Sequence, residues 1–338
     1  MVGTGAREGA KPTTMANWNR YETTDPTLHG PWVLADDSFA SVGGRAIGSI
    51  STPGFYALPD PRPGEPTHII NGGMGGSFYL AQFDVAREKL SNLSSRSYSV
   101  GGSWSVAGKS ESDGSILHIG WVGFGNAPSP IGLELDMMSL VRVLSFDRAS
   151  QSLVTNPIPG YTALRTGTLA RATNLQLLPG APLHTPSLAP GAGAAIDILV
   201  ALNLTAGEAL AFELQLLADQ QGGSMNATSG LEIGAGSLGV NVSATTTADG
   251  SRSGLLSYRG TTYHGTQPFT VLQGEATVEL RVLVDRVIVE AFAQHGRAQL
   301  TAHEWGAEGN TAVHMRSAGA QPAVLSTYEI FGMGCGWL

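Results

Sequence analysis

The stretch of residues 277–303 most constrains the fold, because its pattern is typical of paired β-strands. Over residues 277–284 apolar side chains alternate with mostly polar ones, which is the period of a strand with one buried face. Asp285 interrupts this run, and residues 294–296 break the chain again between two further β-rich runs. We therefore predict a three-stranded antiparallel meander, in which Asp285 opens the first turn and Gly296 supplies a positive φ in the second.

The composition of the whole chain indicates an all-β fold. The 338 residues include 45 glycines and 18 prolines, and only 14% are charged. Many short apolar runs separated by such turn residues are typical of propellers, sandwiches and barrels. The one candidate for a helix, residues 192–219, is explained about as well by the alternation of a strand.

Charge, cysteine content and hydropathy argue against several classes of protein and site. The net charge is −8 and no element gathers Lys or Arg, so we expect no nucleic-acid partner. No apolar run approaches the roughly 20 residues of a membrane helix, and the first residues lack the apolar core of a signal peptide. The single Cys335 excludes an internal disulfide framework. His295 and His303 have no third ligand near them in sequence, so we expect no metal site.

One segment of the meander carries a family signature. Residues 284–302, VDRVIVEAFAQHGRAQLTA, resemble the D-x-S-I-V-E-S-F-x-x-x-G-R-x-x-x-T signature of the C-terminal sandwich in glycoside hydrolase family 32. Val287 and Ala291 replace the usual serines. The matching positions are Asp285, Ile288, Val289, Glu290, Phe292, Gly296, Arg297 and Thr301. That family holds invertases, fructan hydrolases and fructosyltransferases, so the resemblance implies a β-fructofuranosidase-type glycosidase acting on sucrose or fructans, without a cofactor.

The resemblance extends over about residues 18–335 and implies the order of the domains. Residues 138–142, MSLVR, are similar to the family's Met-Ser-Leu/Ile-Pro-Arg element, and residues 157–161 to its linker between domains. We therefore expect a disordered N-terminus at 1–16, the last blades of a five-bladed propeller at 17–156, and a β-sandwich at 157–338. Family membership also implies a secreted or vacuolar location, although the sequence shows no signal peptide.

The acid/base motif is where this chain departs from the family. The family reads Glu-Cys-Pro-Asp/Gly-Phe/Leu-Phe/Tyr, and residues 53–56 align with its last four positions without a gap. Ser51 then stands at the position of the acid/base Glu, and Thr52 at that of the Cys. A serine hydroxyl cannot protonate a glycosidic oxygen near neutral pH as a carboxylic acid of raised pKa can. The start of a strand before a proline explains the pair Ser51–Thr52 equally well.

Other catalytic and binding positions are only partly matched. The nucleophile motif W-M-N-D-P-N-G occurs nowhere in the sequence, although retaining glycosidases need two carboxyl groups about 5–5.5 Å apart. Asp25 is the one candidate for the Asp that stabilises the transition state, and an ordinary Asp-Pro turn is the alternative. Aromatic rings can stack on sugars, but each of these rings can equally belong to the core. The candidates for substrate binding are Phe55, Tyr56, Trp104 and Trp121.

Two classes of function therefore stay open, an impaired glycosidase and a non-catalytic carbohydrate-binding or structural sandwich. For a glycosidase or a binding protein, we expect the carbohydrate partner to be sucrose or a fructan. A propeller without its first blade leaves an open edge, which a partner chain or self-association would cover. The same pattern fits a piece of a longer gene product. N-glycosylation sequons lie at Asn92, Asn203, Asn226 and Asn241.

Overall fold

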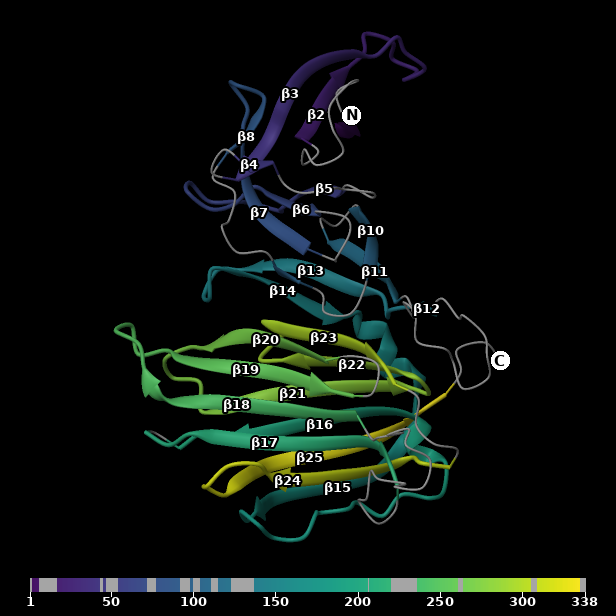
Figure 1. Ribbon diagram of the computed structural model, residues 1–338, viewed down its shortest axis with the longest axis vertical. Coiled ribbons are helices and arrows are strands. Elements are labelled where there is room, and N and C mark those ends of the chain that lie inside the picture. The colour runs from purple at the N-terminus through teal and green to yellow at the C-terminus, as the bar shows by residue number, and fades with distance from the viewer. Residues whose placement is uncertain are drawn as a thin grey trace. The chain divides into compact units, whose positions relative to one another are not determined.

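The computed structural model is an all-β structure, as the sequence predicts (Figure 1). It describes residues 2–5, 17–42, 45–46, 54–71, 77–91, 98–99, 104–110, 115–122, 137–205, 207–219, 236–260, 264–304 and 309–334. Two short 3-10 segments, η1 (Pro159–Leu164) and η2 (Ala192–Ala194), are the only helical turns in this part of the chain. None of its helices is long and apolar enough to cross a membrane. The chain divides into two compact units, residues 1–121 and residues 122–338.

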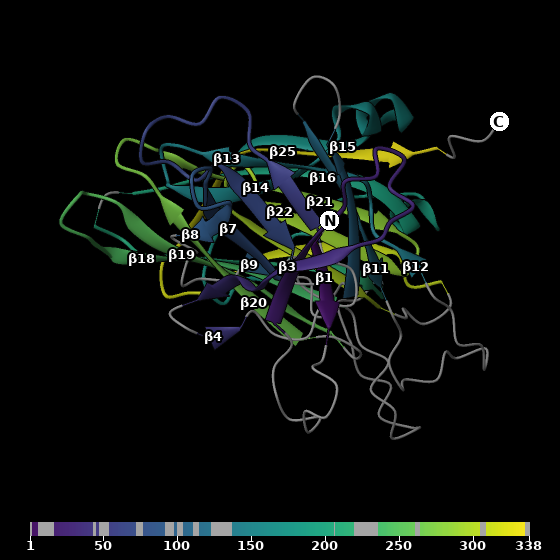
Figure 2. The same ribbon diagram turned by 90° about the horizontal axis from the view of Figure 1, so that it is seen from above.

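The first unit contains small antiparallel sheets. One has the strand order β1 (Val2–Gly5), β2 (Asn17–Glu22), β3 (Val33–Val42) and β4 (Arg45–Ala46). A second has the order β5 (Gly54–Ala57), β6 (His68–Asn71), β7 (Ser77–Asp84) and β8 (Lys89–Ser91) (Figure 1). Strand β9 (Tyr98–Ser99) also pairs with β7, and Figure 2 labels β7, β8 and β9. Strands β10 (Trp104–Ser110) and β11 (Ile116–Val122) form an antiparallel pair.

Strand β1 lies within residues 1–16, whose disorder stays a prediction. Its residues Val2–Gly5 pair with residues 17–20 of β2. The ladder satisfies backbone groups that composition alone cannot assign to a partner. Residues 6–16 lie outside the described part of the chain.

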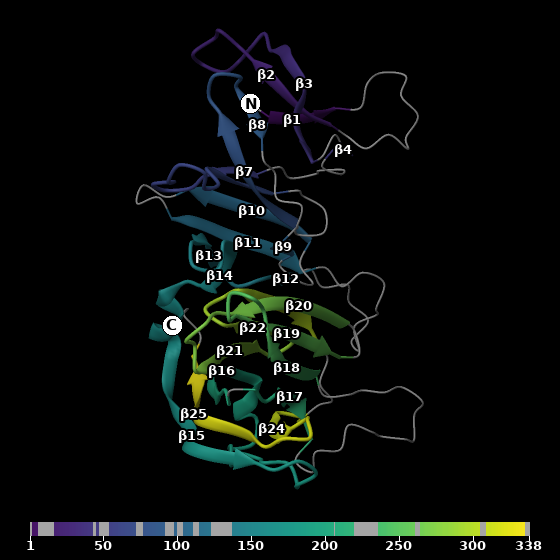
Figure 3. The same ribbon diagram turned by 90° about the vertical axis from the view of Figure 1, so that its left-hand side faces the viewer.

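The second unit contains a two-sheet sandwich. Its strands are β15 (Arg165–Leu177), β16 (Ala195–Asn203), β17 (Leu210–Ala218), β18 (Gly236–Thr246), β19 (Arg252–Arg259), β20 (His264–Val271), β21 (Thr277–Asp285), β22 (Ile288–Ala293), β23 (Ala298–His303), β24 (Ala312–Ser317) and β25 (Ala323–Met333). One sheet has the order β15-β25-β16-β21-β22-β23 and the other β20-β19-β18-β17-β24. Figure 3 shows the two sheets as separate layers. Strands β12 (Met137–Met138), β13 (Arg142–Asp147) and β14 (Ser152–Pro157) precede the sandwich in the same unit.

The core of the sandwich lies between its two sheets and follows the period of two. On β17 every second residue from Leu210 to Leu216 is buried, and β16 presents Ile196, Ile198 and Val200 in the same way. Both strands lie within residues 192–219, the one candidate for a helix. The alternating pattern therefore predicted this segment correctly, and the helical alternative is wrong.

The predicted meander is confirmed. β21 pairs with β22 and β22 with β23, both antiparallel. Asp285 ends β21 before the first turn, and Gly296 has φ +85° in the second. Strand β23 is buried on both faces, since every one of its residues is buried. The cause is a set of side chains that cover the outer face of this sheet.

Candidate functional site

A buried ion pair joins two of the family-like motifs. Arg142, at the start of β13, donates from Nε and Nη2 to Oε2 of Glu290 on β22, at 3.0 and 2.7 Å. Both side chains are completely buried. Nη2 of Arg142 also donates to Oγ1 of Thr301 on β23. Arg142, from the motif at residues 138–142, therefore covers Glu290 and Thr301 on the outer face of β22 and β23.

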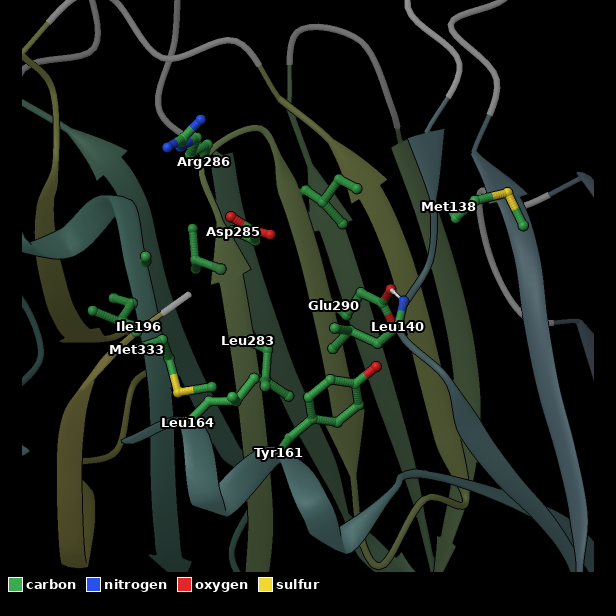
Figure 4. A pocket seen from close by; sticks show the side chains of 14 residues that line it. Met138, Leu140, Tyr161, Leu164, Ile196, Leu283, Asp285, Arg286, Glu290 and Met333 are labelled. Carbon is green, nitrogen blue, oxygen red and sulfur yellow. Dashed lines mark hydrogen bonds between the residues drawn. The ribbon is translucent and has the colours of Figure 1, made fainter. Parts of the chain in front are cut away.

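The other carboxylate oxygen of Glu290 is also engaged. The backbone N–H of Leu140 donates to Oε1 at 2.6 Å. The next N–H, of Val141, donates to the hydroxyl of Tyr161 at 2.8 Å. A pocket of about 500 Å³ lies beside these groups, with Leu164, Leu283, Met333 and Asp285 among its lining residues. Figure 4 shows the Tyr161 hydroxyl directed toward Leu140 and Glu290.

A second charged residue of the signature also binds β13. Nε of Arg297 donates to Oδ2 of Asp147 at 2.9 Å, and its Nη1 contacts Oε1 of Glu275 at 2.8 Å. Burial favours the neutral acid, but hydrogen bonds from Ser150 and Arg297 outweigh it and lower the pKa of Asp147. Glu290 and Arg297 thus each hold one end of β13 against the sandwich.

These contacts decide the chemistry that Glu290 can perform. Burial raises the pKa of this carboxyl, while Arg142 and the Leu140 N–H favour its charged form. Its carboxylate accepts three hydrogen bonds, one from the Leu140 N–H and two from Arg142. We therefore assign Glu290 to holding the fold rather than to proton transfer.

An aromatic cluster in the first unit contains one of the predicted sugar-binding residues. Phe55 on β5 is 37% exposed and stacks on His68 of β6, with ring centroids 4.3 Å apart and planes inclined by 13°. Phe83 of β7 meets both rings edge-on, at 6.1 Å from Phe55 and 5.6 Å from His68. Burial lowers the pKa of His68, so its ring is neutral at physiological pH. The sequence alone missed His68 and Phe83, because their approach depends on strand register.

The other predicted aromatic residues lie in different surroundings. Tyr56 is 8% exposed and points to the opposite face of β5, where burial raises the pKa of its phenol. A Cβ on Gly108 of β10 would lie 2.5 Å from its hydroxyl, so Tyr56 is packed closely in the core. Trp104 on β10 pairs with Trp121 on β11 in the strand register. The Trp121 side chain is half-buried, and the Trp104 side chain is not among the described ones.

Asp25 lies in a local turn. Its Oδ1 accepts from the N–H of Thr27 at 2.8 Å and from the Thr27 hydroxyl at 2.6 Å. These bonds lower the pKa of Asp25, so it is a carboxylate at neutral pH. Its role at a transition state stays a prediction. Ser51 and Thr52, and the sequons at Asn92 and Asn226, lie outside the described residues.

The sequence profile of the C-terminal domain of glycosyl hydrolases family 32 matches residues 161–331, just over half of the chain. The chain belongs to glycoside hydrolase family 32. The matched segment includes β15 to β24 and almost all of β25, and with them the meander that holds Arg142 and Asp147. A search of curated protein sequences found no match.

Solved structures of family 32 proteins share the fold. Fructan 1-exohydrolase IIa from Cichorium intybus superposes with a TM-score of 0.75 at 17% identity, over 96% of this chain and 68% of that one. Sucrose-6-phosphate hydrolase from Lactobacillus gasseri gives 0.64 at 15% identity, over 95% and 61%. Exo-inulinase from Aspergillus awamori gives 0.63 at 17% identity, over 95% and 63%. This chain thus spans about two thirds of the length of these family 32 structures.

No group of three or more His, Cys, Asp or Glu residues within the described ranges is arranged to hold a metal ion. The charged signature residues Glu290 and Arg297 of this family 32 chain form ion pairs, with Arg142 and Asp147 respectively.

Proposed function

We propose that this chain recognises sucrose or β-fructans through its family 32 fold, and that it cleaves them slowly or not at all. One observation carries the proposal. The signature of the sandwich is matched at eight positions, whereas Ser51 stands where the family presents its acid/base carboxyl. Loss of general acid catalysis removes about 10²–10⁴-fold of rate, which is enough to leave binding without useful turnover.

The fold comparison supports a catalytic-domain origin for the residues before the sandwich. The likeness to fructan 1-exohydrolase covers 96% of this chain, well beyond the segment of the profile match. We therefore propose that residues 17–156 correspond to the last blades of a family 32 propeller and residues 157–338 to its sandwich. The relative named here was solved in complex with 1-kestose, which makes that trisaccharide the natural probe.

Phe55 is the residue we propose for sugar contact. Its ring is partly exposed and is held in place by His68 and Phe83. A fixed aromatic face can pack on the apolar C–H face of a sugar without losing rotamer freedom on binding. Tyr56, on the buried face of β5, is not part of this proposal.

Restoring the missing carboxyl tests the account of Ser51. In a version of this chain completed with a W-M-N-D-P-N-G blade, Ser51→Glu supplies a carboxylic acid at the acid/base position. Ser51→Gln is the control of equal size without an acid. We expect Ser51→Glu to raise fructose release from sucrose by roughly 10²-fold or more, and Ser51→Gln to leave it unchanged. Equal rates in the two variants would remove the proposed role of this position.

A non-catalytic binding protein is the second candidate, and the same residue favours it. Titration calorimetry with 1-kestose separates the two, since a binding protein gives heat of binding and no fructose. An enzyme that keeps slow activity gives both. Absence of any binding would contradict both candidates.

A further inference from the structure

The outer face of the sheet β20-β19-β18-β17-β24 carries a polar trough that has no part in the proposed function. This is the face turned away from the other sheet of the sandwich (Figure 3). The trough has a volume of about 630 Å³. That size lies within the range of small-molecule sites, which is about 300–1,000 Å³.

Strand register places one row of residues across the trough. Arg316 of β24 pairs with Glu213, Glu213 with Gly239, Gly239 with Ser257, and Ser257 with Thr266. The row therefore crosses all five strands with its side chains on one face. At its centre Gly239 has no side chain, and the Ser257 hydroxyl lies beside it and donates to its carbonyl. A Cβ there would lie 2.6 Å from Oγ of Ser257, so the floor is tightly packed.

The neighbouring rows form polar walls. On one side Ser237 pairs with Arg259 and Arg259 with His264, and all three line the trough. On the other side Asn241 lines it and pairs with Leu255, which is 38% exposed. The trough thus offers hydroxyl, amide and guanidinium groups, with an apolar side chain next to the wall.

The one carboxylate among the described residues that line the trough is matched by a cation. Nε of Arg316 donates to Oε2 of Glu213 at 2.8 Å, and the Ser237 hydroxyl donates to Oε1 at 2.8 Å. Burial favours the neutral acid, but these hydrogen bonds outweigh it and lower the pKa of Glu213. Glu213 is therefore a fixed acceptor whose charge is matched by Arg316. With Glu213 matched, the hydroxyl and amide groups of the trough favour a neutral, hydroxyl-rich ligand over a cation.

From this arrangement we infer that the trough on the outer face of β17–β20 is a second binding site, for a neutral oligosaccharide. The sugar hydroxyls exchange hydrogen bonds with Asn241, Arg259 and the serine and threonine side chains, and the C–H groups of the sugar pack toward Leu255. The site lies entirely within the sandwich, so its function does not depend on the chemistry at Ser51. It goes beyond the proposed function, because it does not require the ligand to be a fructan.

The experiment is titration calorimetry of bacterially expressed protein, which carries no glycan on Asn241, with maltotriose, cellotriose and 1-kestose. Ser257→Phe fills the centre of the trough, while Asn241→Ala and Arg259→Ala remove polar groups from its walls. Two exposed positions of the same sandwich provide matched controls, Asn203→Ala and Arg171→Ala.

We expect maltotriose or cellotriose to bind, with no measurable heat in Ser257→Phe. Each lost wall residue should weaken binding about fivefold or more, as loss of one hydrogen bond of about 1 kcal/mol implies. The two controls and Phe55→Ala should leave the affinity for maltotriose or cellotriose unchanged. If Ser257→Phe fails to fold, Thr266→Trp on the exposed side of β20 blocks the same trough.

Three results would overturn the inference. One is that neither maltotriose nor cellotriose binds. Another is binding that the trough variants leave intact. The third is binding of an acidic oligosaccharide alone, such as trigalacturonate, which would make Arg259 a simple cation site. Because maltotriose and cellotriose contain no fructose, a failure here leaves the fructan proposal standing, and the reverse also holds.

Discussion

Gly296 and Thr155 are in direct backbone contact. The N–H of Thr155 donates to the carbonyl of Gly296 at 3.0 Å, and a Cβ on Gly296 would lie 2.4 Å from the Thr155 carbonyl oxygen. Gly296 belongs to the turn between β22 and β23, and Thr155 to β14. The signature glycine therefore has two physical reasons, its φ of +85° and the closeness of β14.

These two reasons can be separated with two alanine variants. Gly274, in the turn before β21, has φ +88° and open space around it. Gly274→Ala should cost about 1 kcal/mol of unfolding free energy through backbone strain alone. Gly296→Ala should cost about 2 kcal/mol or more beyond that, because β14 must move. Urea unfolding measures both, and equal losses in the two variants would contradict the proposed contact.

The buried pair Arg142–Glu290 should show strong coupling. Arg142→Met leaves the Glu290 carboxylate buried without its cation, and we expect a loss of about 3–5 kcal/mol. The double variant Arg142→Met/Glu290→Leu removes both charges and should recover most of that loss. Denaturant unfolding of the two variants, with exposed Arg171→Ala as the control, measures this. A single variant no worse than the control would show that the pair does not hold β13 to the sandwich.

Asp249 should give stability a dependence on acid pH. The hydroxyls of Thr247 and Ser251, and the Ser251 N–H, hydrogen-bond its carboxylate and lower its pKa from 3.8 to about 2. A carboxyl whose pKa is lower in the folded state contributes stability above its unfolded pKa and loses it as pH falls through the folded one. The loss attributable to Asp249 therefore falls between about pH 4 and pH 2.

Asp249→Asn isolates this contribution. Thermal unfolding midpoints of the variant should lie below those of the parent chain at pH 6 and approach them by pH 2. A constant difference between the two proteins over that interval would rule out the titration of Asp249 as the cause.

The exposed ring of Phe55 should contribute to sugar binding. Phe55→Ala removes the ring that His68 and Phe83 hold. We expect affinity for 1-kestose to fall by roughly fivefold, as loss of about 1 kcal/mol of aromatic packing implies. Val85→Ala, at a position 78% exposed in the same unit, is the control. Unchanged affinity in Phe55→Ala would remove this residue from the proposed site.

The meander was predictable because its determinants are local. Alternation from Thr277, the break at Asp285 and the glycine at 296 each act within a few residues. The same local rules identify β16 and β17 where a helix was the alternative. Burial of both faces of β23 could not be predicted this way. It depends on Arg142 and Asp147, which meet the meander only after the chain has folded.

The candidate site shows the same division. Phe55 and Tyr56 are adjacent in sequence and equally aromatic, but the pleat of β5 exposes one and buries the other. His68 and Phe83 contact the Phe55 cluster only because the register of β5, β6 and β7 brings them together, which the sequence does not show. Ser51 was identified by its alignment with a motif. Its effect on proton transfer to the glycosidic oxygen must be tested by a measurement of activity.

The most direct test combines binding and turnover in one sample of the purified chain. Calorimetric titration with 1-kestose measures binding, and release of fructose from the same mixture measures cleavage. Our account predicts a saturable heat of binding and fructose release far below the roughly 1–10³ turnovers per second of ordinary enzymes. Turnover within that range, with serine at position 51, would contradict it.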